Sequence, residues 1–314
     1  MPDPLSSAAP PLVSVIIPAR DAAATLARAI DSVRAQDYAP LQIIVVDAAS
    51  HDATAAIAAG YADVRLIRQP SALGAGAARN AGMAAATGEI IAFQDADDEW
   101  LPGKLRRQVD ALIADPAAVF VACGARLIGL EGRDHGPLFD GNIPHAGDAA
   151  WRFLLARNTI ATPCVAVRRA ALLQAGGFDP ALPVAEDQDL WIRLSLLGRL
   201  AYVDQALVRV HVTPVSVSGV GTGLGARQQI EITLPMIRRH VAAQRARLSR
   251  REVRGIMGER LCRVGRAAYS YGQYHDGLAL VLEAMALGYR PLENLLFLAS
   301  ASPPGRWLKR LIRR

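Results

Sequence analysis

The stretch 89–98 reads Glu-Ile-Ile-Ala-Phe-Gln-Asp-Ala-Asp-Asp, an apolar run of strand length that ends in three carboxylates. Such a run predicts a buried strand whose carboxyl end delivers acidic side chains to the crevice where open α/β sheets bind ligands. Three carboxylates in four residues repel one another, and hard oxygen ligands suit Mg²⁺ or Mn²⁺. The alternative is a solvated turn with an Asp N-cap before a helix that Pro102 starts, and the stretch alone leaves both open.

The segments before this stretch alternate between strand and helix patterns. The predicted strands cover 12–17, 41–46 and 64–67, and the predicted helices cover 22–36, 52–59 and 75–86. Strands that alternate with helices of this length predict βαβ units and a parallel sheet. Three strand ends would then gather polar side chains at one edge, namely Arg20 with Asp21, Asp47 to Asp52, and Asp95 to Asp98. We predict that this edge is the active site.

Composition sets outer limits on the protein. With 314 residues and 52% hydrophobic residues, the chain can bury a full core, yet no stretch has the ~20 uninterrupted apolar residues of a membrane-spanning helix. Residues 1–11 lack the basic start and apolar block of a signal peptide, which predicts a disordered leader and a cytoplasmic protein. The three cysteines, Cys123, Cys164 and Cys262, match no disulfide or zinc spacing, so we expect reduced thiols.

Positive charge is concentrated near the C-terminus. Residues 245–314 hold fourteen Lys or Arg and five Asp or Glu. The last stretch, 303–314, has an apolar face of Trp307, Leu308, Leu311 and Ile312 that is surrounded by cations. This pattern suits the inner face of an anionic membrane, and a helix docked on the preceding helices is an equally open alternative. No nucleic-acid motif accompanies these cations, so we expect no nucleic-acid partner.

Five short motifs follow one another over about residues 12–211. They are Val13–Pro18, Ile44–Thr54, Gly74 with Ala78–Gly82, Asp95–Asp98 followed by Pro102, and Gly176–Asp179 with Glu186–Trp191. In this order and at this spacing they resemble the signature of the family 2 glycosyltransferases. The resemblance implies an α/β fold of the GT-A type, with a Rossmann-like mixed sheet flanked by helices. It also implies a nucleotide-sugar donor, Mg²⁺ or Mn²⁺ as cofactor, and inversion at the anomeric carbon.

The resemblance assigns donor contacts to particular positions. Asp47 matches the first acid of the family's Asp-Asp-Gly-Ser motif, whereas Ala48 stands where the second acid usually meets the base, so the nucleotide base stays open. Asp52 matches the later acid of that motif or acts as a helix N-cap. The implied donor-binding residues are Pro18, Arg20, Asp47, Arg79, Asp95, Asp97, Arg209 and His211.

Metal, base and acceptor residues follow from the later motifs. The resemblance implies that Asp97 is the ribose-side or metal-side carboxylate with Asp98 or Asp95 as its companion, and we take Asp97 and Asp98 as the metal ligands. It also implies that Asp187 is the general base for the acceptor hydroxyl. Asp187 lies at the predicted start of a helix, so complementing the helix dipole is an alternative role for it. The implied acceptor-binding residues are Gly177, Phe178, Glu186 and Trp191.

The predicted function is transfer of a hexose or N-acetylhexosamine to a hydroxyl of a glycan or lipid-linked acceptor, in envelope or exopolysaccharide synthesis. The donor is a nucleotide-diphosphate sugar, with a UDP-sugar favoured. One alternative is a non-catalytic GT-A-like module that binds sugar nucleotides or partners, which Ala48 motivates. Another is a dinucleotide-binding oxidoreductase, suggested by 74–79, but Arg79 stands at its third glycine and a third strand precedes it.

The predicted domains are a GT-A catalytic domain over 12–222 and a helical C-terminal region over 223–314 that ends in the basic amphipathic helix. Between them, 213–225 is rich in small residues and predicts a loop that closes over the donor and acceptor. Helical spacing follows over 226–248, 250–269 and 273–287.

Overall fold

The computed structural model describes residues 9–139, 146–213 and 223–301. The predicted helix at 303–314, most of the predicted loop at 213–225 and the first eight residues of the predicted leader lie outside these ranges. Pro11 is buried, and its carbonyl accepts a hydrogen bond from the Tyr38 hydroxyl at 2.6 Å. The prediction of a disordered leader through residue 11 is therefore wrong at its last residue.

The chain forms two compact units, and we describe each by itself. The sheet unit comprises Met1–Leu154 and Asn158–Val215, and the helical unit comprises Leu155–Arg157 and Ser216–Arg314. No helix in the described ranges is both long and apolar enough to cross a lipid bilayer.

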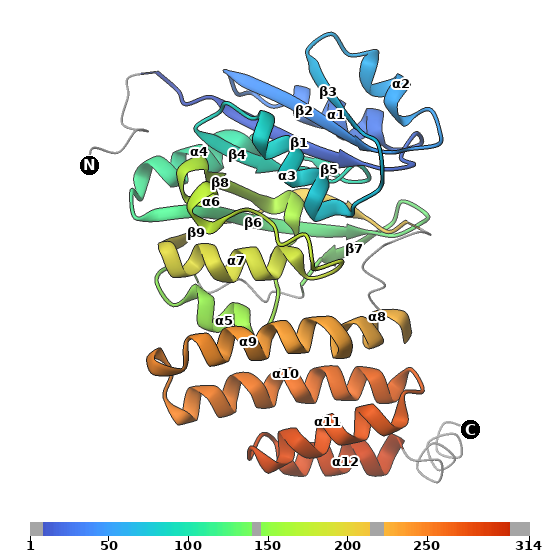
Figure 1. The fold of residues 1–314 in the computed structure, drawn as a ribbon, viewed down its shortest axis with the longest axis vertical. Coiled ribbons are helices and arrows are strands. Elements are labelled where there is room, and N and C mark those ends of the chain that lie inside the picture. The colour runs from blue at the N-terminus through green and yellow to red at the C-terminus, as the bar shows by residue number, and fades with distance from the viewer. Residues whose placement is uncertain (1–8, 140–145, 214–222, 302–314) are drawn as a thin grey trace. The chain divides into compact units, whose positions relative to one another are not determined.

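The sheet unit contains a mixed sheet with nine strands in the described residues (Figure 1). The strands are β1 (Val13–Ala19), β2 (Leu41–Ala48), β3 (Val64–Gln69), β4 (Ile90–Phe93), β5 (Glu99–Trp100), β6 (Ala118–Ile128), β7 (Asp134–Pro137), β8 (Val165–Arg168) and β9 (Arg199–His211). Their order is β3-β2-β1-β4-β8-β6-β9-β5, and β7 pairs with β6. The helices are α1 (Leu26–Arg34), α2 (Thr54–Ala59), α3 (Ala75–Ala85), α4 (Lys104–Ala114), α5 (Ala150–Ala156), α6 (Arg169–Ala175) and α7 (Glu186–Leu197).

The first half of the sheet is parallel, as the βαβ pattern predicts. β1 pairs in parallel with both β2 and β4, and β2 pairs in parallel with β3. The register places Ala19 opposite Asp47, and Ile16 opposite Phe93. The carboxyl ends of β1, β2 and β4 therefore open onto the same edge, and the predicted gathering of their polar side chains is confirmed.

Helices cover both faces of this parallel half, which explains why its strands are apolar throughout. Val15 and Ile17 of β1 pack in one apolar cluster with Leu26 and Ile30 of α1. Ile16 points to the opposite face, where α3 crosses the sheet. A Cβ at Gly82 of α3 would lie 2.5 Å from Ile16 Cγ2, so only glycine allows this close approach.

The second half of the sheet is mixed. β8 lies between β4 and β6 and pairs antiparallel with both, while β9 pairs in parallel with β6 and antiparallel with β5. A repeat of βαβ units produces only parallel pairs, so it does not predict the antiparallel pairs in this half. It brings β9, the last strand, beside the acidic stretch that follows β4.

The helical unit consists of α8 (Gly223–Gln228), a π-helical turn (Gln229–Thr233), α9 (Leu234–Ala243), a 3₁₀ turn (Arg245–Arg247), α10 (Arg250–Ser270), α11 (Tyr274–Ala286) and α12 (Pro291–Ala301). The helical spacing predicted over 226–248 is confirmed through Ala243, with a π-helical turn inside it and a 3₁₀ turn after it. Pro235 at the start of α9 lacks the amide hydrogen that would continue the preceding turns, and the backbone widens there into the π turn. A capping box of Ser249 and Glu252 starts α10.

Candidate active site

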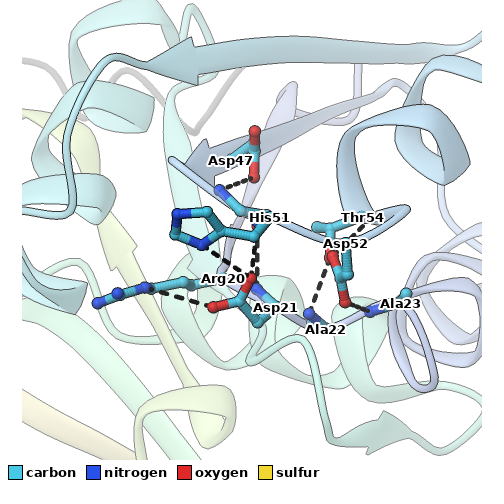
Figure 2. A network of polar contacts seen from close by, with 9 residues as sticks. Arg20, Asp21, Ala22, Ala23, Asp47, His51, Asp52 and Thr54 are labelled. Carbon is cyan, nitrogen blue, oxygen red and sulfur yellow. Dashed lines mark hydrogen bonds and ion pairs between the residues drawn. The ribbon is translucent and has the colours of Figure 1, made fainter.

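The loops after β1 and β2 are joined by a network of hydrogen bonds (Figure 2). Asp21, whose backbone has a positive φ of 46°, accepts a hydrogen bond from the His51 amide at 2.8 Å, and its own amide donates to Ser50 Oγ at 2.9 Å. Asp52 accepts from the amides of Ala23 at 3.0 Å and Thr54 at 2.9 Å. These bonds fix the two strand ends relative to each other.

The network bears on the two roles predicted for Asp52. Ala53 occupies the N-cap position of α2 and makes no side-chain capping bond, but Asp52 Oδ1 accepts from the amide of Thr54, the first residue of α2. The hydrogen bonds from the Thr54 side chain and from the Ala23 amide hold the pKa of the Asp52 carboxyl below its usual value. Asp52 therefore fastens one loop to the other and also satisfies an amide at the start of α2, while its role as the later acid of the family motif stays a prediction.

The predicted donor residues at these strand ends differ in exposure. Pro18 is half-buried and Arg20 is exposed. Asp47 is almost fully buried, and one of its oxygens accepts from the Ser50 amide at 3.2 Å. Arg20 is therefore the most accessible of the three, and its side chain lies 3.6 Å from the Asp21 carboxylate.

The three carboxylates after β4 have three different environments. Asp95 forms an ion pair with Arg79 at 2.8 Å. Asp98 is only 4% exposed and accepts from the backbone amide of His211 at 3.0 Å. Asp97 is half-buried; its carboxylate accepts from the Thr213 hydroxyl at 3.4 Å, and its backbone carbonyl accepts from the Arg28 guanidinium at 2.5 Å. Burial and the neighbouring carboxylates raise the pKa of Asp97 and raise that of Asp98 further.

These carboxylates fit the predicted divalent cation. In the ranges that the structure describes, no set of three or more His, Cys, Asp or Glu side chains is arranged to hold a metal ion alone. Asp97 and Asp98 would supply two carboxylates, the number that Mg²⁺ commonly takes from a protein when substrate phosphates provide the other ligands. Adjacent carboxylates with raised pKa values are also the groups that a cation would stabilise.

Arg79 connects this acidic stretch to the start of α7. Its guanidinium is buried and forms ion pairs with Asp95 and Glu186, each at 2.8 Å. Burial lowers the pKa of Arg79, but the two carboxylates outweigh it and the net shift is upward. The guanidinium also lies over the Phe178 ring, 5.3 Å from its centroid. Arg79 and Asp95 are thus bonded to each other, and their contact with the donor stays a prediction.

Asp187 lies at the start of α7, and no residue in the described ranges forms an ion pair with it. Its carboxylate accepts from Asn158 Nδ2 at 3.0 Å and from the Gln188 amide at 2.6 Å. Burial, followed by the charge of Glu186, raises the pKa of Asp187 to about 7. A carboxylate with a pKa near neutrality is suited to accept a proton in a general-base step.

The turn before α7 is held in place by Asn80 of α3. The Asn80 side chain donates to the Phe178 carbonyl at 2.8 Å and accepts from the Phe178 amide at 2.9 Å. Gly177 has a φ of 72°, and a Cβ there would lie 2.7 Å from Asn80 Oδ1. The turn therefore requires glycine both for its conformation and for its contact with α3.

These features match a known family. The family model described as Glycosyl transferase family 2 matches residues 14–176, more than half of the chain. The chain belongs to glycosyl transferase family 2. The resemblance seen in the five sequence motifs is thereby confirmed.

Two curated relatives of this family 2 glycosyltransferase have informative names. The succinoglycan biosynthesis protein ExoO of Rhizobium meliloti is 40% identical over 126 residues, which cover 39% of this chain and 36% of ExoO. WfgD of Escherichia coli, named UDP-Glc:alpha-D-GlcNAc-diphosphoundecaprenol beta-1,3-glucosyltransferase, is 36% identical over 104 residues, 32% of this chain and 41% of WfgD. The aligned region spans less than half the length of either relative.

A solved structure shows the same fold. The mannosyltransferase PcManGT from Pyrobaculum calidifontis, in complex with GDP-Man and Mn²⁺, is 22% identical and superposes with a TM-score of 0.62 over 95% of this chain and 83% of that chain. The family 2 chain described here therefore has the GT-A fold, with helices following it, as predicted.

Two side chains predicted to contact the acceptor are buried in the core of this family 2 protein. Phe178 and Trp191 are 1% and 0% exposed, and they pack with Phe93 and Phe120 in one aromatic cluster. The prediction that these two side chains touch an acceptor is wrong for the conformation described, because other rings cover them. Their packing supports the turn at Gly177 and the first turn of α7 from beneath.

Arg209 and His211 lie beside the acidic stretch of this glycosyltransferase. Both pair with Glu99: Arg209 Nη1 lies 3.2 Å from each carboxylate oxygen, and His211 Nε2 lies 3.6 Å from one of them. Burial and the charge of Arg28 lower the pKa of His211, against the opposing effect of Glu99. The predicted contact of both residues with the donor diphosphate stays a prediction.

Proposed function

We propose that this family 2 protein transfers a hexose or N-acetylhexosamine from a nucleotide-diphosphate sugar to a hydroxyl of a glycan or lipid-linked acceptor, with inversion. The supporting observation is that Arg79 joins two groups of carboxylates. One group is the acidic stretch with Asp97 and Asp98, and the other contains Asp187 with its pKa of about 7. Donor activation and acceptor deprotonation need two such groups close together.

In the proposed reaction, Asp187 accepts the proton of the acceptor hydroxyl. The acceptor oxygen then forms its bond to the anomeric carbon while the bond from that carbon to the diphosphate oxygen breaks. Attack from the face opposite the leaving group inverts the anomeric configuration. Asn158 and the Gln188 amide orient the carboxylate for this transfer through their hydrogen bonds.

Asp97 and Asp98 would hold Mg²⁺ or Mn²⁺ in this proposal, and the ion would neutralise the charge that develops on the departing diphosphate. The Mn²⁺ named with PcManGT supports use of a divalent ion by this fold. Arg20, Pro18 and Asp47 would contact the nucleoside at the ends of β1 and β2.

The names of relatives guide the choice of substrates. WfgD is named for a UDP-Glc donor and a diphosphoundecaprenol acceptor, and ExoO for succinoglycan biosynthesis. We therefore propose a UDP-sugar donor and a role in envelope or exopolysaccharide synthesis. Because a lipid-linked acceptor lies in a membrane, we also propose a cytoplasmic protein that binds the inner membrane face through the apolar and cationic residues of 303–314.

The test is a donor screen with the purified full chain. UDP-glucose, UDP-N-acetylglucosamine and GDP-mannose are each added with Mn²⁺ or with a chelator, and thermal stability and donor hydrolysis are measured. The true donor at a hundred times its dissociation constant would add about 2.7 kcal/mol of stability, only with the metal. Binding of a donor without any hydrolysis or transfer would support instead the non-catalytic module that Ala48 motivates.

The oxidoreductase alternative loses its structural basis. Gly76 of the segment 74–79 faces protein, because a Cβ at this position would lie 3.3 Å from Glu186 Cγ and 3.4 Å from Phe178 Cβ. The start of α3 is therefore covered by the turn before α7 and by α7 itself. A dinucleotide-binding glycine would leave that position open for the close approach of a pyrophosphate.

A further inference from the structure

A cationic hollow lies in the helical unit, outside the region that the family model matches. Its volume is ≈ 540 Å³, and it is lined by Arg250, Arg251, Arg254, Gly255, Leu287, Gly288 and Tyr289. These residues come from the start of α10 and from the turn between α11 and α12, which lie at the same end of the helical unit (Figure 1). We call this feature the arginine hollow.

Among the residues that the structure describes, the three arginines of the hollow have no acidic partner. All three are exposed, and none forms an ion pair within the ranges that the structure describes. Glu252, the acid nearest to them in sequence, accepts hydrogen bonds from the amide and hydroxyl of Ser249. Three guanidinium groups that converge on one concavity favour a ligand with phosphate-type oxygens, which arginine can bind through two hydrogen bonds at once.

An apolar surface follows the arginine hollow in the sequence. Leu292, Leu295 and Leu296 of α12 are 75%, 51% and 71% exposed. Their i, i+3, i+4 spacing places them on one face of the helix, opposite the buried Asn294. We call these three residues the leucine stripe. The stripe starts three residues after Tyr289, so a ligand with an anionic head in the hollow could lay an apolar chain along α12.

Charge decides which occupant fits both features. A second copy of this face would bring three unpaired arginines against three others, which repel. The tail at 303–314 carries five cations and no acid, so it would repel the hollow as well. A soluble polyanion would match the arginines but would leave the leucines in water. An anionic lipid matches both, because its phosphate and its hydrocarbon chain are covalently joined.

We propose that the arginine hollow and the leucine stripe bind the phosphate headgroup and the upper acyl chain of an anionic phospholipid at a membrane surface. This contact is separate from the tail at 303–314 and from the proposed glycosyl transfer. Vesicle binding without any nucleotide sugar therefore tests it independently of the activity.

The experiment is sedimentation of the full chain with phosphatidylcholine vesicles that contain or lack phosphatidylglycerol. The first variant replaces all three hollow arginines, Arg250→Gln, Arg251→Gln and Arg254→Gln. A cation near an anionic lipid surface contributes roughly fivefold to partitioning, so the triple variant should bind phosphatidylglycerol vesicles on the order of a hundredfold less. The matched control removes three exposed arginines of the sheet unit, Arg65→Gln, Arg106→Gln and Arg133→Gln, and should change binding far less.

Two further pairs of measurements test the shape and the apolar part of the site. A Cβ at Gly255 meets no atom within 4 Å, so Gly255→Glu can place a carboxylate among the arginines without a clash. This variant should lose binding, whereas Gly255→Ala should keep it. Leu292→Gln with Leu296→Gln should also weaken binding, because the lipid chain loses its contact with α12.

The proposal is overturned if the triple arginine variant and the control bind anionic vesicles equally. It is also overturned if the leucine variant binds like the wild type, since the arginines alone would then account for binding and no acyl chain would contact α12. Inorganic phosphate can compete for the arginines but lacks an apolar chain, so it should displace the protein from vesicles only at concentrations far above that of the lipid headgroups. Full displacement by phosphate at the concentration of the headgroups would assign the hollow to a soluble phosphate compound and overturn the lipid assignment.

Discussion

Replacing Asp187 with asparagine should lower activity and raise stability together. As the general base, Asp187 is expected to account for roughly a hundredfold to ten-thousandfold of the turnover rate. The same carboxylate is unfavourable in the folded protein when it is ionised, because burial raises its pKa to about 7. Asparagine has nearly the same shape and no charge, so Asp187→Asn removes the base and the buried charge in one step.

The size of the stability gain follows from the pKa. The difference between an ordinary value of 3.8 and a value of about 7 in the folded protein is worth about 4 kcal/mol. Because the residue is half-buried rather than enclosed, we expect about 2 kcal/mol at pH 8. Between pH 3.8 and 7 the folded protein holds the proton more tightly than the unfolded chain, so wild-type stability falls as the pH rises through this window. The gain from Asp187→Asn should therefore be roughly a third as large at pH 5 as at pH 8.

Guanidinium chloride unfolding at pH 5 and pH 8, alongside turnover measurements, checks both effects. If Asp187 only complemented the dipole of α7, the amide would instead destabilise the protein by about 0.3–1 kcal/mol. Asp276→Asn is the matched control, because Asp276 is an exposed acid in the first turn of α11. A loss of stability in Asp187→Asn similar to that of the control, or wild-type turnover, would refute the assignment of Asp187 as the base.

Four other substitutions or deletions test the remaining assignments. Asp97→Asn should abolish Mn²⁺-dependent binding of a nucleotide diphosphate in calorimetry while leaving the unfolding midpoint close to wild type; unchanged Mn²⁺ dependence would contradict the metal site. Arg79→Met should destabilise the protein by about 3–5 kcal/mol in denaturant, because two partly buried carboxylates lose their cation. A smaller loss of stability would show that water solvates the two carboxylates and would contradict a structural role for Arg79. Lys104→Met should stabilise the protein by about 1–4 kcal/mol in denaturant at pH 7, because burial lowers the pKa of this fully buried ammonium to about 8, and a loss of stability would contradict this reasoning. Deleting 303–314 should weaken binding to anionic vesicles at low salt but not donor hydrolysis, and binding indifferent to the deletion would favour a tail that packs on the protein.

Sequence periodicity predicted the parallel half of the sheet because that half is built from local patterns. Each of the first strands is an apolar run, each is followed by a helix, and βαβ connections have one common handedness. The positions of Asp47 and Asp97 at strand ends follow directly from that arrangement. The antiparallel insertion of β8 between β4 and β6 depends on pairing between distant segments, and its four-residue run carries no signal of partner or direction.

The partners of side chains were less predictable than their positions. Arg79 was predicted to meet the donor, but its carboxylate partners lie 16 and 107 residues away, a pairing that no local pattern reveals. Trp191 was predicted to meet the acceptor, but it is buried against aromatic rings from β4, β6 and the turn before α7, and no local pattern brings these rings together. Asn158, which orients Asp187, was missed because no sequence pattern marks it. Asn80 lies inside one of the five motifs, yet its contact with the turn at Phe178 appears only in the fold.

The distribution of cations among the acids of the site separates supporting carboxylates from functional ones. Arg79 neutralises Asp95 and Glu186, the two acids that link the end of β4 to the start of α7. Within the described residues, the carboxylates of Asp97 and Asp187 have no ion-pair partner and accept hydrogen bonds from neutral groups, and both have raised pKa values. A fold optimised only for stability would pair or remove such charges. Unpaired carboxylates beside neutralised ones are what the proposed reaction requires, because Asp97 would bind a cation and Asp187 would accept a proton.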